Sequence, residues 1–256
     1  MTRCPKCGHA RTRAESHVHE GICPACGIAY AKWQARRGGS ARPAAPVPAS
    51  PGQAAPEEDD HGPLLARLRQ QLLEMPERVE PAAFWGRAAL LAALALWSVK
   101  FIVNGIDWES IGGSFLHGAN LAFHEFGHLF FRPFGEFMGI LGGSLFQVLL
   151  PLALLAVFAV RQRDNFAAAV ALWWCGQNFV DLAPYIRDAE YRVLPLVGGG
   201  GEESHDWGNL LSMLDAVDSC YALARTSFTL GALVMLAALA WGAYLLVLQR
   251  AQQRAQ

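Results

Sequence analysis

The stretch Ile111–Phe131 reads IGGSFLHGANLAFHEFGHLFF, and its one formally charged residue is Glu125. On a helix, His124 and His128 lie four residues apart and project from one face, where they can share a metal ion. Glu125 lies beside them, at the position where a general base would activate water at a metal. Because imidazoles and a carboxylate are costly at membrane depth, this segment is interpreted as functional.

The composition favours a multi-pass membrane protein with a soluble appendage over a soluble enzyme. Of the 256 residues, 53% are hydrophobic and 17% are charged, and the mean hydropathy is +0.20. The net charge of −1 does not favour a polyanionic partner. The chain starts without the apolar run of a cleavable signal peptide, so internal segments are expected to insert it. Its alanine, glycine and arginine content favours a bacterial inner membrane.

The first 33 residues predict a zinc ribbon. Two CPxCG motifs, Cys4–Gly8 and Cys23–Gly27, are separated so that fifteen residues lie between the inner cysteines, a spacing typical of a four-cysteine zinc site. The glycine of each motif permits a tight turn in which backbone amides approach the thiolates. A redox dithiol pair would not explain two matched motifs. The predicted ligands of this structural zinc are Cys4, Cys7, Cys23 and Cys26.

The next two segments predict a linker and a surface helix. Residues 34–62 are rich in Gly, Ser, Ala and Pro, and they have too little apolar surface to offset the entropy of ordering, so a disordered linker is expected. Residues 63–80 place leucines on one helical stripe. This pattern predicts an amphipathic helix that either lies on the membrane or packs as a solvated helix against the protein.

The basic N-terminal region allows two interpretations. Zinc ribbons bind proteins or nucleic acids, but basic residues before a first membrane span are equally typical of a cytoplasmic end. We therefore expect a protein partner for the ribbon and not a nucleic acid. The basic residues in question are Arg3, Lys6, Arg11, Arg13, Lys32, Arg36 and Arg37.

Residues 84–250 predict an all-α membrane domain with about five membrane segments, each long and apolar. Lys and Arg near the segment ends are almost evenly divided between the two orientations. A thiolate zinc site favours a reducing compartment, and hence a cytoplasmic N-terminus. The predicted segments are Ala88–Ile106, Gly112–Phe131, Phe137–Val160, Phe166–Ile186 and Tyr221–Leu248.

Two histidines do not complete a catalytic zinc site, which usually has three protein ligands. Asp181 is the favoured third ligand, because it is a lone acid near the end of an apolar segment where a metal would compensate its charge. Pro184 is expected to break the helix locally there. His205 and Asp206, in a glycine-rich loop, compete for the same position, and His117 is either an interior histidine or a further group of the site.

These motifs resemble the site-2 protease family of intramembrane zinc metallopeptidases over about residues 110–190. The resemblance implies that His124, His128 and Asp181 hold a catalytic zinc and that Asn178 stabilises the oxyanion. The chain is similar to a divergent member, because it has Val180–Leu182 where the family typically has Leu-Asp-Gly around the aspartate, and it lacks a recognisable PDZ insertion. The residues that carry the resemblance are His124, Glu125, His128, Gly142, Gly143, Ser144, Gln147, Asn178 and Asp181.

The predicted function is hydrolysis of peptide bonds in or near a membrane segment of a protein or peptide substrate, with Glu125 as general base. Two alternatives stay open. In the first, the chain is a non-catalytic membrane adaptor whose metal sites are structural. In the second, it is a metal transporter in which buried histidines and acids form a path across the membrane.

Overall fold

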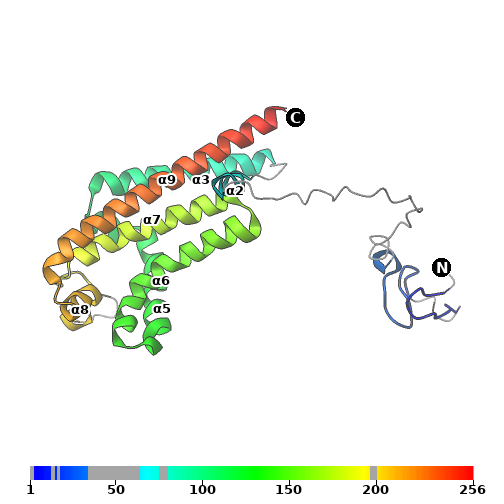
Figure 1. Ribbon diagram of the computed structural model, residues 1–256, viewed down its shortest axis with the longest axis horizontal. Helices are drawn as coiled ribbons and strands as arrows, with labels where there is room; N and C mark the ends of the chain where they lie inside the picture. Colours follow the sequence, from blue (N-terminus) through cyan, green and yellow to red (C-terminus); the bar gives the residue numbers. More distant parts are fainter. Residues whose placement is uncertain are drawn as a thin grey trace, which may run out of the picture. The chain divides into compact units, whose positions relative to one another are not determined.

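The computed structural model describes residues 3–12, 15, 18–33, 64–74, 80–196 and 201–255 (Figure 1). The chain divides into two compact units, Met1–Asp59 and Asp60–Gln256. The predicted linker, residues 34–62, lies outside the described residues. Each unit is therefore described by itself.

The first unit is built from two matching turns, one around each CPxCG motif. In each turn the first cysteine donates its N–H to a carbonyl five residues on, Cys4 to His9 at 2.8 Å and Cys23 to Ile28 at 3.0 Å. Gly8 and Gly27 adopt left-handed φ angles of 74° and 69°, which glycine tolerates without strain. The two turns therefore have the same backbone structure, as the matched motifs predict.

The second unit is all-helical within the residues described. Three helical stretches are long and apolar enough to cross a membrane: Pro81–Asn104, Glu136–Gln162 and Val217–Arg254. The prediction of about five membrane segments stays a prediction for the other two. The helices are α2 (Leu64–Leu73), α3 (Pro81–Asn104), α4 (Trp108–Gly112), α5 (Phe115–Phe131), α6 (Glu136–Ala156), α7 (Asn165–Arg187), α8 (Asp206–Met213) and α9 (Cys220–Ala255).

Helix α7 is the buried centre of this unit, with α9, α6 and α3 packed around it (Figure 1). It contacts α9 most closely at Gly176 and Gly231, where a Cβ on either glycine would lie within 2.8 Å of the carbonyl oxygen of the other. Small residues at such a contact allow two helix backbones to approach. Trp173 anchors α3 by donating its indole N–H to the hydroxyl of Ser98 at 2.7 Å. The central position of α7 explains why its polar residues are buried.

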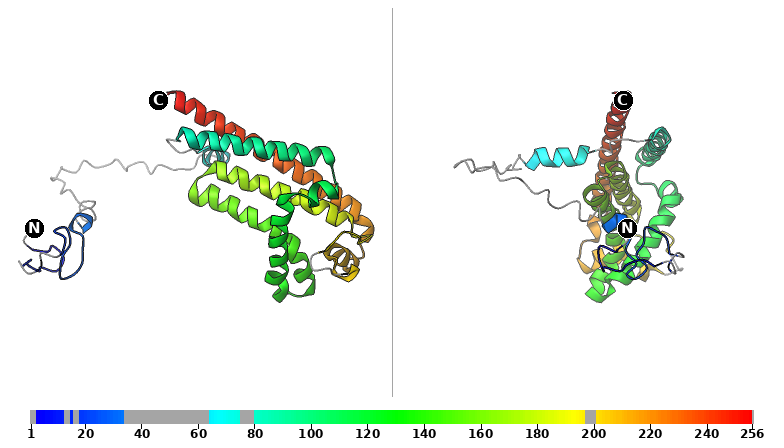
Figure 2. Two further views of the ribbon diagram at one scale, coloured as in Figure 1. Left: turned by 180° about the vertical axis from the view of Figure 1, so that it is seen from behind. Right: turned by 90° about the vertical axis from the view of Figure 1, so that its right-hand side faces the viewer.

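Helix α5 runs at a steep angle to the axes of α3, α7 and α9 (Figure 2). It packs on α6 through the glycine of the HEFGH motif, since a Cβ on Gly127 would lie 2.2 Å from the carbonyl oxygen of Gly142. Ser114 begins the helix by accepting a hydrogen bond from the Leu116 N–H at 3.3 Å. Phe126, Leu129 and Phe130 of α5 are exposed, and the rings of Phe126 and Phe130 also lie beside the Phe146 ring of α6, with centroids 5.0 and 5.7 Å away.

The two ends of the helical unit differ in what they carry. At one end α3 begins and α9 finishes, and the Arg250 guanidinium lies over the rings of Phe84 and Trp85. At the other end α7 finishes and α9 begins, and Ala189, Leu211 and Cys220 form a small apolar cluster there with α8. The α8 segment and the C-terminal half of α7 belong to this second end, and they carry the site described next (Figure 1).

Candidate metal sites

The two histidines of the HEFGH motif point their Nε2 atoms at one carboxylate. Asp206 Oδ2, on α8, lies 2.9 Å from His124 Nε2 and 3.2 Å from His128 Nε2. These three residues form a group whose ligand atoms lie within 4.8 Å of one another. The side chains of His124 and Asp206 are 7% and 14% exposed, and that of His128 is 27% exposed, so the group is open to solvent mainly at His128.

The other nitrogen of each imidazole is held by an acceptor. His128 Nδ1 lies 2.9 Å from the carbonyl oxygen of Gly139, and His124 Nδ1 lies 3.0 Å from Gln147 Oε1. Both acceptors require a hydrogen on Nδ1. In the neutral imidazoles, Nε2 therefore carries a lone pair directed at Asp206. A cation shared by the three groups, either a proton on Nε2 or a metal ion, would stabilise this convergence, and the three residues form a group that could hold a metal.

Asp181 determines which way the Gln147 amide faces. Its Oδ2 accepts hydrogen bonds from Gln147 Nε2 at 3.0 Å and from Asn120 Nδ2 at 3.2 Å. These hydrogen bonds direct the NH2 group of Gln147 at Asp181 and leave its Oε1 atom for His124. Asp181 thus acts on His124 through one intervening side chain.

The prediction of Asp181 as third ligand is therefore corrected: the group that can hold a metal contains Asp206 and does not contain Asp181. The physical reason is that both Asp181 oxygens have other partners, Oδ1 with His117 at 3.1 Å and Oδ2 with the two amides. Pro184 also does not break the helix, because α7 continues through it to Arg187. Asp206, one of the competitors weighed from the sequence, is the third member of this group.

Asn178 does not line the cavity that contains the metal group. It is fully buried on α7 and donates its side-chain amide to the carbonyl oxygen of Trp174 at 2.9 Å. Its position three residues before Asp181 places it only about 60° from Asp181 around the helix, but its NH2 group is directed at the backbone of its own helix. The contact of Asn178 with a substrate oxyanion stays a prediction.

Local structure holds Asp206 in place from both sides. The Asp206 N–H donates to the Tyr185 hydroxyl at 2.9 Å, and His205 caps α8 by accepting from the Gly208 N–H at 3.0 Å. His205 is fully buried, and its Nε2 lies 3.3 Å from Asp188. Burial raises the pKa of Asp206, but without a metal the imidazoles of His124 and His128 can carry protons on Nε2 and donate to the carboxylate, which outweighs burial and holds the pKa at about 2. The carboxylate is therefore ionised.

Gly143 of α6 leaves room beneath the two imidazoles. A Cβ at this position would lie 2.5 Å from Nε2 of both His124 and His128. The glycine-rich element noted in the sequence thus has a steric role at the point where the lone pairs meet. Glu125 lines the same cavity, whose volume is about 320 Å³, together with Tyr185 and His117.

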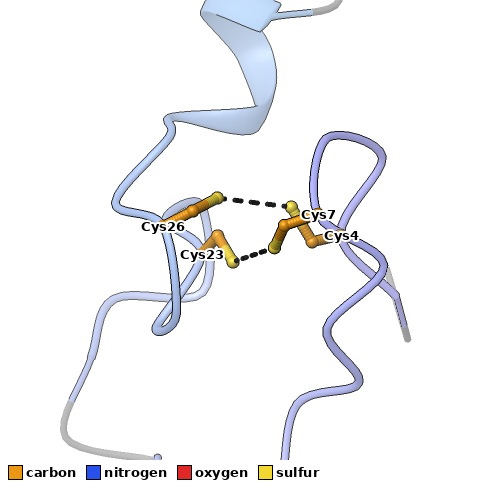
Figure 3. A group of neighbouring side chains, drawn as sticks. All are labelled: Cys4, Cys7, Cys23 and Cys26. Atoms are coloured by element: carbon orange, nitrogen blue, oxygen red, sulfur yellow. Dashed lines mark hydrogen bonds between the residues drawn. The ribbon is translucent and has the colours of Figure 1, made fainter.

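The four cysteines of the first unit form a second group (Figure 3). Cys4 Sγ lies 3.7 Å from Cys26 Sγ, and Cys7 Sγ lies 3.7 Å from Cys23 Sγ. Four sulfurs around a zinc ion at about 2.3 Å would be about 3.8 Å apart. Burial raises the pKa of Cys23, but the backbone N–H groups of Cys26 and Ala25 outweigh it and lower the pKa to about 6.

Both groups fit a tetrahedral metal ion of the zinc type. The ribbon offers four sulfurs, as a closed structural site does, and the helical site offers two imidazoles and a carboxylate, which leave one position for another ligand. Comparison of the chain with protein-family models, curated proteins and solved structures finds no match. The functional argument therefore depends on the geometry of the two sites.

Proposed function

We propose that the chain is a zinc-dependent membrane endopeptidase whose ligands are His124, His128 and Asp206. The observation that carries this proposal is the convergence of two imidazole lone pairs and an ionised carboxylate beside Glu125 in one cavity. Three protein ligands with one open position are typical of catalytic zinc, whereas structural sites are closed by four. The second zinc would be structural and would belong to Cys4, Cys7, Cys23 and Cys26.

Zinc bound at this site would lower the pKa of a water molecule and polarise the scissile carbonyl group. Glu125 projects into the cavity from the turn that carries both histidines. It would take the proton from the water and later deliver it to the leaving amine. Asp181, through Gln147, would hold His124 in the tautomer that presents Nε2 to the metal.

The substrate is proposed to be a membrane segment or the residues next to it. The cavity walls include the apolar side chains of Leu121, Ile140, Leu182 and Leu194, which suit the apolar residues of a membrane segment. The metal group lies toward the end of the helical unit where α7 finishes. Cleavage close to one membrane surface is therefore favoured over cleavage at the bilayer centre. The ribbon would recruit a protein partner.

To test the proposed general base, Glu125→Gln is expected to slow cleavage about 10²–10⁴-fold and to leave the zinc content unchanged, because Glu125 contacts none of the ligand nitrogens. New N-termini would be compared by chemical labelling in membranes from cells that produce either protein. Glu109→Gln, an exposed acid on α4, is the matched control. Identical sets of new N-termini with wild type and Glu125→Gln would refute the peptidase.

The orientation is proposed from the compartment that the cysteine site favours. We propose that the end where α3 begins and α9 finishes faces the cytoplasm, because a thiolate zinc site, which favours a reducing compartment, precedes α3 in the chain. The metal site would then open toward the opposite side of the membrane. Basic residues lie at both ends, Arg87, Arg161, Arg163, Arg250 and Arg254 at the first and Arg187, Arg192 and Arg225 at the second, and the second end also carries the acids Asp107, Glu109, Asp188, Glu190, Asp215 and Asp218.

This orientation predicts the behaviour of reporter fusions. Green fluorescent protein fused after residue 256 is expected to fluoresce, because it would stay in the cytoplasm. Alkaline phosphatase fused after Asp215 is expected to be active outside the cytoplasm, and the same reporter fused after Arg163 is expected to be inactive. An active phosphatase at Arg163 together with an inactive one at Asp215 would show the reverse orientation.

A further inference from the structure

The cavity extends along α5 beyond the metal group as far as His117. His117, Leu121, His124, Glu125 and His128 all line it, as expected of positions that share one face of a helix. His117 is two turns from His124, which corresponds to a rise of about 10.5 Å. It therefore lies at the end of the cavity away from the metal ligands.

Asp181 orients the His117 ring through Oδ1, the carboxylate oxygen that does not accept from Gln147. His117 Nδ1 lies 3.1 Å from Asp181 Oδ1, and the carboxylate requires a hydrogen on that nitrogen. The ring also packs edge-on against Trp108, with 5.1 Å between centroids and an interplanar angle of 83°. Two contacts thus determine the ring position, as expected of a group held ready for a ligand.

The Nε2 atom of His117 is available to a ligand. Among the residues the structure describes, it has no hydrogen-bond partner, while the side chain is 19% exposed and lines the cavity. When the ring is neutral and carries its hydrogen on Nδ1, this nitrogen is an acceptor. A lone pair on a ring that a carboxylate orients and that lines the cavity is suited to an N–H donor.

An unwound membrane segment has such donors. Once a substrate helix is extended for cleavage, its backbone N–H groups lose their internal partners, and in a membrane each unsatisfied group costs several kcal/mol. An extended chain advances about 3.3 Å per residue, so the distance from His124 to His117 corresponds to about three residues. A donor at that place in the substrate would reach His117 while the scissile carbonyl is at the metal.

We propose that His117 is a substrate-binding residue that accepts a hydrogen bond from a backbone N–H about three residues from the scissile bond. Asp181 is its positioning residue and links it to the metal group, because the same carboxylate orients Gln147 and hence His124. The inference rests on the proposed peptidase function and assigns a role to His117 that metal binding does not explain.

The experiment uses peptide hydroxamates, which bind a catalytic zinc without being cleaved. Two series with one to four leucines, extending in opposite chain directions from the hydroxamate, would be titrated into the zinc-loaded full-length protein. In each compound one amide at a time is replaced by an ester, which removes a single N–H. With wild type, the ester about three residues from the hydroxamate is expected to weaken binding about 2- to 10-fold, whereas the other esters have smaller effects.

Two variants connect this effect to the imidazole. His117→Phe keeps a ring against Trp108 but has no acceptor, so the amide and its ester analogue are expected to bind equally. His117→Gln can donate to Asp181 and direct its Oε1 atom into the cavity, so it is expected to restore part of the difference. Both variants are expected to keep the zinc content of wild type.

Each other outcome would overturn the inference. An equal ester penalty in wild type and in His117→Phe would show that another group accepts the N–H. Loss of zinc from both variants would assign His117 to the metal. Failure of every hydroxamate to bind zinc-loaded wild type would refute the catalytic zinc site itself, and the inference with it. Hydroxamate binding without any His117 effect would leave the proposed function standing and refute only the role of His117.

Discussion

Asp206→Ala is expected to reduce the zinc content of the purified chain from two ions to one and to abolish cleavage. The substitution removes the carboxylate that both Nε2 atoms approach, at 2.9 and 3.2 Å. Two imidazoles that remain in a largely buried site do not supply the three protein ligands of a catalytic zinc. The remaining zinc is expected in the ribbon, which provides an internal standard for metal analysis.

Two further variants make this measurement specific. Glu203→Ala removes an exposed acid three residues away and is expected to keep both zinc ions. Asp181→Asn replaces the acceptor-only carboxylate by an amide that can present NH2 to Gln147, so the orientation of His124 is no longer enforced. Changes of this kind weaken metal binding about 10- to 100-fold, so zinc should return at high concentration.

The comparison also tests the third ligand directly. If Asp206→Ala keeps two zinc ions and Asp181→Ala keeps one, the third ligand is Asp181, as the family resemblance implied. A chelator competition with full-length protein separates the two cases. A variant that has lost a ligand is expected to need much more free zinc to refill the site than a variant in which a ligand has only lost its orientation.

Gly143→Ala is expected to abolish zinc binding by His124, His128 and Asp206 while the chain stays folded. The added Cβ would lie 2.5 Å from both ligand nitrogens, closer than a carbon and a nitrogen can approach without displacement of one of them. Both imidazoles are held from behind, by Gln147 and by the carbonyl of Gly139, so they cannot retreat without losing these bonds. Zinc binding at the helical site and cleavage should both be lost.

Gly118→Ala is the matched control, since it changes a glycine of α5 next to His117 and its Cβ would meet no atom within 4 Å. Alanine is the better helix former by about 1 kcal/mol, so Gly118→Ala should keep both zinc ions and unfold at the same or a higher temperature. Equal zinc content in Gly143→Ala and Gly118→Ala would contradict the steric role of Gly143.

Much of the fold follows from local patterns in the chain. Uncharged runs predict the long helices, and the structure has three stretches suited to crossing a membrane. The matched CPxCG motifs predict two equal turns, and the structure brings their sulfurs together at 3.7 Å. The pair His124 and His128 is likewise local, because the helical period places residues four apart on one face.

The sequence by itself determined the helical class, the four cysteines of the ribbon and the two imidazoles of the second site, because each depends on residues close together in the chain. Only the tertiary structure brings a third candidate ligand to the two imidazoles. Asp206 and Asp181 are both acids beyond the HEFGH helix, and sequence order does not distinguish them. The choice depends on how α6, α7 and α8 pack around α5: Gln147 and Asn120 occupy the Asp181 carboxylate, whereas Tyr185 and His205 hold Asp206 against the two Nε2 atoms.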